Sequence, residues 1–250
     1  MGAAGERGVR ERRAELEGRL AAVRERIAAA CAAAGRHPDQ VEVMAVTKTV
    51  AAADVAVLLD LGLTLFGENR AQEAGAKVAE VAALRPGANP RWHFIGGLQR
   101  NKARAVVAWA DRVESVDSVR LADALDRAAA RACDEGRRTG PLPVLLQYSV
   151  DGDPERGGVA RDGLLALADH VAGCAALRLE GLMAVAPLDA DPEAAFADIA
   201  DAAAALRSAH PAASVLSAGM SGDLEVAIRH ASGVVRVGTA LVGYRPLASL

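Results

Sequence analysis

The lysines are the first residues in this sequence that suggest a chemistry, because among 29 basic residues the only lysines are Lys48, Lys77 and Lys102. Lys48 ends the apolar segment "VEVMAVTK", where apolar neighbours would disfavour the charged ammonium. A neutral amine can attack a carbonyl carbon and form a Schiff base. The alternative, a lysine whose stem simply leaves the strand end for water, stays open.

Two later segments have the composition of anion-binding loops. In "LSAGMSGDLEV", Ser221 lies between two glycines at the expected start of a helix, where free N–H groups and a hydroxyl can face an anion. In "VVRVGTALVG", Gly238 and Thr239 follow the last expected strand. Ser221 also suits an ordinary N-cap, and Gly238 an ordinary tight turn. Their agreement favours a phosphate site.

A lysine and a phosphate site together indicate a phosphorylated carbonyl compound. Pyridoxal 5'-phosphate fits, and so does a sugar phosphate in an aldolase-type reaction. Arg236 bears on this choice, since a guanidinium that faces a pyridine nitrogen can only donate, and the nitrogen must then stay unprotonated. An arginine paired with Glu68 inside the protein is the alternative interpretation.

The pattern of elements predicts how these residues meet. Residues 10–34 place apolar side chains three and four positions apart, which indicates a helix. The expected strands that follow are Val41–Thr47, Thr64–Gly67, Trp92–Gly96, Arg112–Val116, Val144–Val150, Leu177–Val185, Ser214–Ala218 and Val234–Val237. Helical segments are expected around 51–61, 69–84, 99–110, 118–136, 159–173, 192–209 and 221–231.

Eight strands joined by helices favour an α/β fold with one parallel (β/α)8 TIM barrel and an extra N-terminal helix. We expect this single domain to span residues 10–250, behind a disordered segment at 1–9. The chemistry of such a barrel lies at the C-terminal ends of its strands. Polar or sulfur-containing residues stand at nearly every strand end, in chain order Lys48, Glu68, Asn69, His93, Glu114, Ser115, Gln147, Ser149, Met183, Ser217, Ser221 and Arg236.

Composition excludes several classes of function. The net charge is −3 and aromatic residues make up 3% of the chain, so neither nucleic acid nor an anionic membrane is an expected partner. The charged N-terminus fits neither a signal peptide nor a membrane span, which predicts a cytoplasmic protein. Cys31, Cys133 and Cys174 lie far apart, without a CxxC or a Cys/His cluster. We therefore expect no metal site and no disulfide.

In this order, "AVTKTV", "FGENRAQE", "WHFIGGLQRNK", "ESVDS", "GLMAVAP", "LSAGMSGD" and "VRVGTALVG" resemble the YggS/PROSC family of pyridoxal 5'-phosphate homeostasis proteins. These are barrels similar to the N-terminal domain of alanine racemase, and the match covers roughly residues 10 to 245. The resemblance implies a pyridoxal phosphate cofactor held as an aldimine on Lys48. The other cofactor contacts that it implies are Met220, Ser221, Gly238 and Thr239 at the phosphate, Arg236 near the pyridine nitrogen, and Asn69 and His93 on the cofactor face.

One segment departs from the family pattern. Many relatives carry an asparagine and a lysine after the fifth strand, where this chain has Ser149 and Arg156 in "YSVDGDPERGGV". The departure puts in doubt any contact made by that asparagine. The cofactor site predicted above does not depend on it.

Two functions from different classes follow from the resemblance. A carrier would hold pyridoxal phosphate, buffer its free level and deliver it to apo-enzymes, without robust catalysis. An amino-acid racemase is the alternative, but related racemases add a C-terminal β domain with a tyrosine as the second acid/base. Here we expect neither Tyr148, Tyr244 nor His93 to serve as that base. Without that dimer domain we expect a monomer. Lys102 stands at the expected start of a helix after the third strand, near the barrel mouth, where a second amine could assist transfer. The alternative interpretation, a solvated lysine at a helix start, is favoured.

Overall fold

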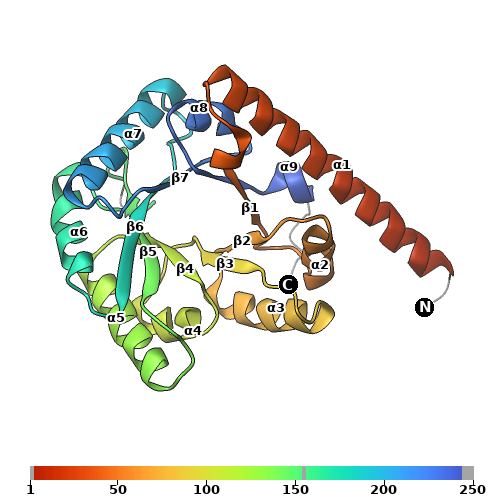
Figure 1. The fold of residues 1–250 in the computed structure, drawn as a ribbon, viewed down its shortest axis with the longest axis horizontal. Coiled ribbons are helices and arrows are strands. Elements are labelled where there is room, and N and C mark those ends of the chain that lie inside the picture. Colours follow the sequence, from red (N-terminus) through yellow and green to blue (C-terminus); the bar gives the residue numbers. More distant parts are fainter. Residues whose placement is uncertain (1–2, 154–155, 244–250) are drawn as a thin grey trace.

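The strands of the protein close into one parallel barrel. The computed structural model describes residues 3–153 and 156–243. Neighbouring strands pair in chain order and β1 pairs with β8, so the sheet has no free edge (Figure 1). The strands are β1 (Glu42–Val46), β2 (Leu65–Glu68), β3 (Arg91–Phe94), β4 (Arg112–Val116), β5 (Leu142–Tyr148), β6 (Leu177–Ala184), β7 (Val215–Met220) and β8 (Val234–Val237). This confirms the predicted TIM barrel.

The helices surround the barrel on its outer side (Figure 1). They are α1 (Ala3–Ala33), α2 (Ala52–Asp60), α3 (Ala71–Leu84), α4 (Ala103–Val107), α5 (Val119–Asp134), α6 (Leu164–Ala172), α7 (Pro192–Ala209), α8 (Leu224–Arg229) and α9 (Thr239–Val242). Short 3-10 turns stand at Pro38–Gln40, Arg100–Lys102 and Arg161–Gly163. The sequence did not predict α9, because four residues are too few for a helical period to show.

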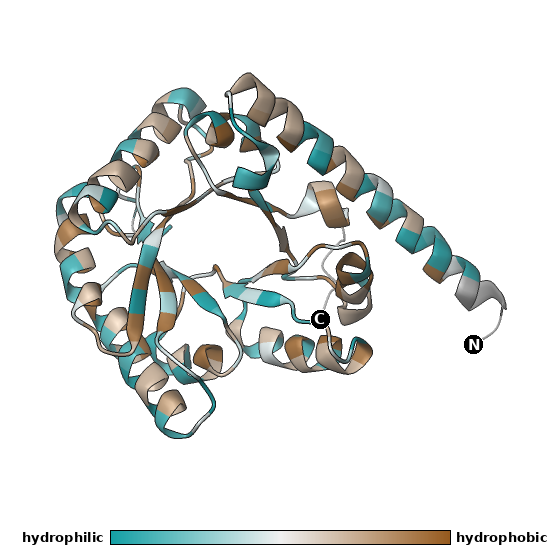
Figure 2. Cartoon of the chain, in the orientation of Figure 1, coloured by the Kyte–Doolittle hydropathy of each residue, from teal (hydrophilic) through white to brown (hydrophobic). Residues whose placement is uncertain are grey.

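The core lies mainly between the strands and the helices. Outward-facing strand residues such as Phe66, Val113 and Leu216 are buried against helical residues. The helices carry both hydrophobic and hydrophilic residues, as elements with one face on the barrel and one in water must (Figure 2). This division between faces fixes which strand residues point outward, and therefore which ones point into the barrel.

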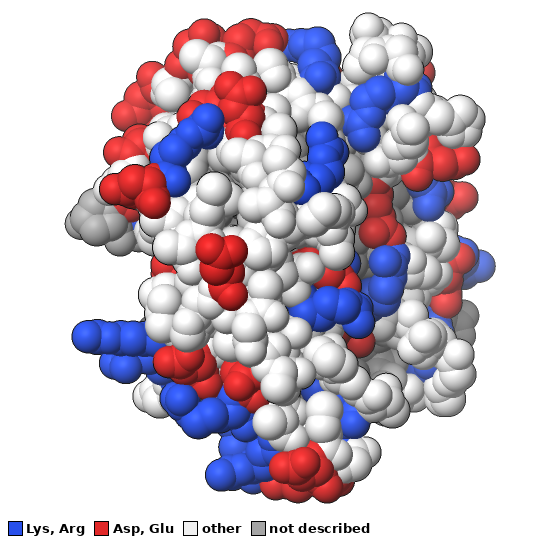
Figure 3. Space-filling model, turned by 60° about the vertical axis from the view of Figure 1, so that its left-hand side comes forward, with Lys and Arg blue, Asp and Glu red and all other residues white. Residues whose placement is uncertain are grey.

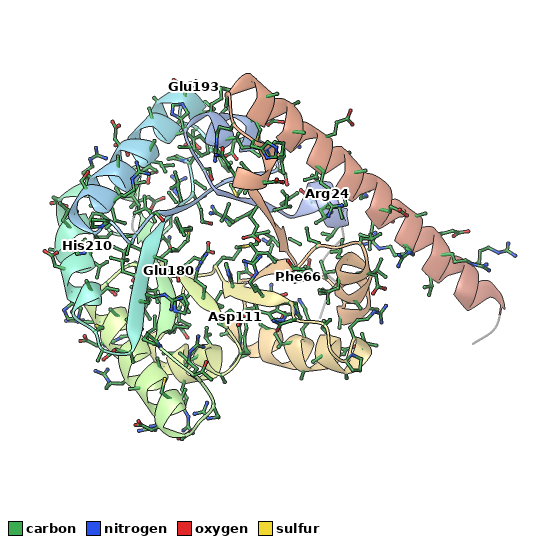
Figure 4. All side chains as sticks on the ribbon, viewed as in Figure 1. Arg24, Phe66, Asp111, Glu180, Glu193 and His210 are labelled. Carbon is green, nitrogen blue, oxygen red and sulfur yellow. The ribbon has the colours of Figure 1, made fainter. Side chains whose placement is uncertain are left out.

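The barrel interior is layered along its axis. Met44, Leu65 and Val234 form a small apolar cluster inside it. Charged pairs stand nearer the N-terminal strand ends, where Arg112 contacts Glu180 and Arg91 contacts Glu42. The polar side chains near the C-terminal strand ends, described below, therefore sit on an apolar floor. Glu180 projects from β6 toward the barrel interior in Figure 4.

Helix α1 covers one side of the barrel, as its apolar spacing predicts. Its five stripe residues are buried, namely Leu16, Leu20, Val23, Ile27 and Cys31. Arg12 ties its first half to the barrel by donating to Asp54 Oδ2 at 2.9 Å and to the carbonyl of Val242 at 2.9 Å. Residues 3–9 of the segment that we expected to be disordered are helical, since α1 begins at Ala3, and residues 1–2 lie outside the described residues. Residues 3–9 contain no proline, so nothing in them interrupts the helical backbone.

The surface agrees with the balanced charge of the sequence. On the face shown in Figure 3, acidic and basic side chains are interspersed and separated by wide uncharged areas. In the part of the chain that the structure describes, no helix combines the length and the apolar character needed to cross a membrane.

Candidate functional site

Lys48 stands at the mouth of the barrel, two residues beyond the end of β1. Thr47 is buried, whereas Lys48 is exposed within a turn. Among the described residues, no hydrogen bond or ion pair engages its ammonium group. The expectation that apolar neighbours desolvate Lys48 is wrong for this structure, because β1 ends at Val46 and the lysine extends past the apolar layer. Its amine is therefore accessible to a ligand and has no competing partner.

A second lysine fixes the backbone just before Lys48. Lys77 of α3 donates to the carbonyl of Thr47 and, at 2.6 Å, to Oε1 of Glu68. The hydroxyl of Thr47 donates to the same carboxylate oxygen at 2.7 Å. We call Thr47, Glu68 and Lys77 the lysine clamp. It joins the ends of β1 and β2 to α3, and so it holds the turn that carries Lys48.

The two predicted anion loops lie side by side, because β7 and β8 are neighbours in the barrel. Within the described residues, the backbone N–H groups of Ser221, Gly222, Gly238 and Thr239 donate to no acceptor. Met220 differs, since its N–H donates to Oδ1 of Asp223 at 2.5 Å and so fixes the bend of the first loop. Four free donors at adjacent strand ends form a cradle for a phosphate-sized anion.

Gly219 is required for the shape of the first loop. Its φ is +92°, which side chains of L-residues rarely allow, and a Cβ there would lie 2.4 Å from the Cβ of Ala227. Glycine thus lets β7 turn tightly against α8. The turn brings Ser221 to the barrel mouth.

Arg236 is held inside the barrel by three hydrogen bonds. It is 4% exposed. Nη1 donates to the carbonyl and hydroxyl of Ser217 at 2.7 and 3.0 Å, and Nη2 donates to the carbonyl of Ala184 at 2.7 Å. Among the described residues, Nε donates to no acceptor, and this atom is not completely buried. A guanidinium held in this way keeps its Nε–H and one Nη2–H without an acceptor in the described residues, so both are available to a ligand.

Arg236 belongs to a buried polar chain across the barrel. Ser217 Oγ donates to Glu114 Oε2 at 2.6 Å, and Glu114 Oε1 lies 2.7 Å from Nδ1 of His93. The alternative pairing of Arg236 with Glu68 is wrong, because the lysine clamp holds Glu68. His93 is 2% exposed and is tied to Glu114. It therefore supports the layer under the mouth, and its predicted contact with a cofactor stays a prediction.

The charge of Glu114 is maintained by its neighbours. Burial acts to raise its pKa, but the hydrogen bond and charge of His93, the hydrogen bond from Ser217 and the charge of Arg236 outweigh burial and lower the pKa. Burial lowers the pKa of Arg236, opposed by the charges of Glu114 and Asp223. An arginine stays protonated under these conditions. The buried carboxylate and guanidinium therefore stabilise each other through Ser217.

Glu114→Gln is expected to destabilise the protein by about 1.5–3 kcal/mol near neutral pH, because Arg236 would lose its opposite charge. A carboxylate whose folded pKa is depressed stabilises the fold above its unfolded pKa, and that contribution is lost as pH falls through the folded pKa. The wild type and the variant should thus converge in acid. Urea unfolding at several pH values from 7 downward checks this. A gap that stays constant to the acid limit would contradict it, and the exposed Glu135→Gln is the control.

Asn69 lies at the mouth after β2, in close contact with Gly96. Its Oδ1 is buried without a hydrogen-bond partner in the described residues, so this oxygen is free to accept a hydrogen bond from a ligand. A Cβ on Gly96 would meet the Asn69 carbonyl oxygen at 2.5 Å and its Cα at 2.8 Å. Glycine at position 96 therefore allows the β2 and β3 ends to approach each other.

Gly96→Ala is expected to push Asn69 away from the mouth at a cost of about 1–3 kcal/mol, which is typical of overpacking against backbone. Ligand binding at the mouth should weaken more than overall stability does. The measurement pairs ligand affinity with urea unfolding. Gly97→Ala is the matched control, because a Cβ there meets nothing within 4 Å. Equal affinity of the two variants would show that Asn69 does not contribute.

The remaining sequence candidates lie around or outside this mouth. Lys102 ends the 3-10 turn Arg100–Lys102 and lines a cavity of about 340 Å³ between the loops after β2 and β3. Ser149 Oγ accepts from the N–H of Gly152 at 3.1 Å, and Arg156 pairs with Asp151 and Asp153. The two departures from the family pattern thus form local loop contacts of their own.

Tyr148 is not placed as a base at the mouth. Tyr148 points outward and donates to Asp198 at 2.7 Å. Burial and that carboxylate raise the pKa of Tyr148 to about 12. Tyr244 lies outside the described residues.

Sequence reasoning missed the lysine clamp. Glu68 and Lys77 are nine residues apart across a strand end and a helix, so no short motif joins them. A larger hollow of about 880 Å³ lies at the opposite, N-terminal strand ends and is lined by Arg24, Glu42 and Arg112 among others. It contains none of the predicted site residues. The C-terminal strand ends are therefore the candidate site.

The structure therefore defines a closed parallel (β/α)8 barrel whose C-terminal strand ends carry an exposed lysine, two loops with free N–H groups and a buried arginine. The family "Alanine racemase, N-terminal domain" matches residues 19–246. The chain is 46% identical to the pyridoxal phosphate homeostasis protein of Mycobacterium tuberculosis, with 96% of each chain covered. It therefore belongs to the alanine racemase N-terminal domain family and, within it, to the pyridoxal phosphate homeostasis proteins.

Solved structures agree with this assignment. PipY of Synechococcus elongatus, solved with pyridoxal phosphate bound, is 33% identical and covers 91% of this chain and 100% of its own, with a TM-score of 0.77. A Bifidobacterium adolescentis protein described as unknown is 31% identical, with a TM-score of 0.83 and coverage of 92% and 96%. Alanine racemase from Corynebacterium glutamicum, at 17% identity and a TM-score of 0.66, shares the fold.

Proposed function

We propose that this protein binds pyridoxal 5'-phosphate at the barrel mouth and acts in the homeostasis of that cofactor. The observation that carries the proposal is that β1, which leads to Lys48, pairs with β8, and β8 pairs with β7. Lys48, whose amine has no partner among the described residues, therefore follows a strand end next to the loops with free N–H groups. Relatives over most of the chain bear the name of this function. When bound, the cofactor supplies an aldehyde carbon and an electron-withdrawing ring.

Each residue has a distinct task in this proposal. Lys48 Nζ is the nucleophile for the aldehyde carbon. Ser221, Gly238 and Thr239 orient the phosphate, with Met220 shaping their loop. Arg236 Nε donates to the pyridine nitrogen, and Asn69 completes the rim. A guanidinium in this place keeps the ring nitrogen unprotonated, which weakens the ring as an electron sink and favours holding over turnover.

We propose further that the protein is a carrier without robust catalysis. Racemisation needs an acid/base on each face of the substrate's α-carbon. His93 is buried against Glu114, and Tyr148 donates outward to Asp198, so neither is positioned for that work. The same proposal includes delivery to apo-enzymes, a monomeric state and a cytoplasmic location. The location is part of it because a carrier must share a compartment with its recipients.

Absorption spectroscopy of the purified protein tests the proposal. A visible band that borohydride fixes, followed by peptide mapping of the label to Lys48, is the expected result. Amino-acid racemisation followed in the same samples should be absent. Robust racemisation would establish the enzyme alternative instead. A protein that stays colourless with added pyridoxal phosphate, and that forms a borohydride-fixed adduct with a sugar phosphate, would establish the aldolase alternative.

Lys102→Ala tests whether a second amine assists delivery. Lys102 lines the cavity between the loops after β2 and β3 together with Arg70, whose guanidinium pairs with Glu73 at 2.9 Å. If Lys102 assists, the variant should transfer cofactor to an apo-acceptor enzyme several-fold more slowly while its absorption band is unchanged. Arg104→Ala, on the neighbouring helix, is the control. Transfer at the wild-type rate would contradict a role for Lys102.

A further inference from the structure

A second group of chemically active side chains lies on the outer side of the barrel. Asp123 on α5, His170 on α6 and Cys174 just after α6 each offer one ligand atom, and these atoms all lie within 4.8 Å of one another. Nε2 of His170 is 2.8 Å from Oδ1 of Asp123. Helices α5 and α6 are neighbours around the barrel (Figure 1). None of the three residues belongs to the mouth.

The backbone holds this cluster in place. The N–H of Cys174 donates to the carbonyl of Val171 at 3.1 Å, so the thiol-bearing residue continues the end of α6. Asp126, one turn after Asp123 on α5, accepts from the N–H of Ala176 at 2.8 Å. The segment after α6 is therefore tied to α5 on both sides of the cluster. His170 and Cys174 are four residues apart, a spacing that places two ligands on one side of a helix end.

We propose that Asp123, His170 and Cys174 form a binding site for a divalent transition-metal ion of the zinc type, with water as the fourth ligand. A carboxylate, an imidazole and a thiolate are the three side-chain ligands that Zn²⁺ takes, usually in tetrahedral geometry. The sulfur and nitrogen ligands select against Mg²⁺ and Ca²⁺, which prefer oxygen. The His170 and Asp123 side chains are 35% and 41% exposed, which leaves room for water.

The pair of His170 and Asp123 needs only a small adjustment, and the sulfur of Cys174 lies within 4.8 Å of both ligand atoms. Zn–N and Zn–O bonds of about 2.0–2.1 Å at a tetrahedral angle separate the two ligand atoms by about 3.4 Å. The present His170 to Asp123 contact would open by about 0.6 Å from its 2.8 Å, which side-chain rotation supplies. When the ion binds, the thiol of Cys174 releases its proton to solvent, and His170 carries its remaining proton on Nδ1 so that Nε2 is free to bind the ion. The bound ion would then join α5 to α6.

Titration with Co²⁺, whose bond to a thiolate gives a charge-transfer absorption, tests this site. We expect one ion per chain with a thiolate band, and displacement of Co²⁺ by Zn²⁺. Cys174→Ser should abolish the band, and His170→Gln should weaken Co²⁺ binding at least about tenfold, as loss of even an outer partner of a metal site does. Asp126→Asn, which alters the supporting contact, should weaken binding less than His170→Gln does.

Matched controls separate the site from ordinary ion pairs. His210, which Figure 4 labels, pairs with Asp169 at 2.9 Å. Among the described residues, no third metal-ligating side chain joins this pair, so His210→Gln should leave Co²⁺ binding unchanged. Cys133→Ser should likewise keep the band. The proposal is overturned if Co²⁺ gives no thiolate band, or if the band survives Cys174→Ser. Circular dichroism and the pyridoxal phosphate absorption of each variant establish that it is folded.

Discussion

Lys48→Ala should lose covalent retention of pyridoxal phosphate completely. Without the amine no bond to the aldehyde carbon can form, and borohydride should fix no cofactor to the protein. The phosphate cradle and Arg236 remain, so weak binding should persist with an affinity reduced at least about 100-fold, or about 2.7 kcal/mol. Lys48 is exposed and unpaired, so its removal should leave the free energy of unfolding of the cofactor-free protein nearly unchanged. Cofactor retained after gel filtration, with and without borohydride, measures the effect.

Lys48→Arg is the matched control, since it restores the positive charge but not a nucleophilic amine. It should behave like Lys48→Ala in the borohydride assay and retain somewhat more cofactor noncovalently. A borohydride-fixed label that persists in Lys48→Ala would contradict the assignment. Lys102 would then be the amine to test, because the ammonium of Lys77 is held by Glu68 and Thr47.

The sequence predicts the barrel well because hydrophobic residues repeat with different periods in strands and in helices. Both bounds of β4 and β8 coincide with the predicted bounds, and the bounds of the other strands differ by at most two residues. Boundaries depend on where ladder hydrogen bonds stop, and β5 starts two residues early because Leu142 pairs with Leu177 on β6. Long-range pairing of this kind leaves no local sequence signal.

The polar residues at the predicted strand ends indicate where the candidate site lies, but they do not predict which side chains contact one another there. Glycine-rich segments reveal the β7 and β8 loops, since tight turns at strand ends need them. The partner of Glu114 across the barrel is Ser217, 103 residues away, and no spacing rule connects the two. The cluster of Asp123, His170 and Cys174 could not be predicted for the same reason. Asp123 and His170 lie on different helices and are 47 residues apart in the sequence. Side-chain partners across a barrel follow from closure of the sheet, which only the structure supplies.

Lys77→Met is expected to lower the free energy of unfolding by about 3–5 kcal/mol, which is typical when one partner of a buried ion pair is removed. Glu68 is fully buried and the Lys77 side chain is 11% exposed. Oε2 of Glu68 has no partner among the described residues, so its carboxylate depends on the contacts that Oε1 receives from Lys77 and Thr47. Methionine matches the length of the lysine stem but donates nothing. Urea unfolding of the cofactor-free protein is the measurement.

The double variant Glu68→Leu with Lys77→Met distinguishes a lost charge pair from lost packing. It should recover much of the stability, because an apolar pair of similar volume avoids the unpaired buried carboxylate. Both variants should still hold cofactor less firmly than wild type, since the Thr47 carbonyl loses the donor that fixes the turn before Lys48. Glu73→Gln, which breaks only the exposed pair with Arg70, should change neither quantity appreciably. A Lys77→Met protein as stable as wild type would show that the clamp is not a stabilising pair. Unchanged cofactor retention in both variants would show that the lysine clamp does not position Lys48.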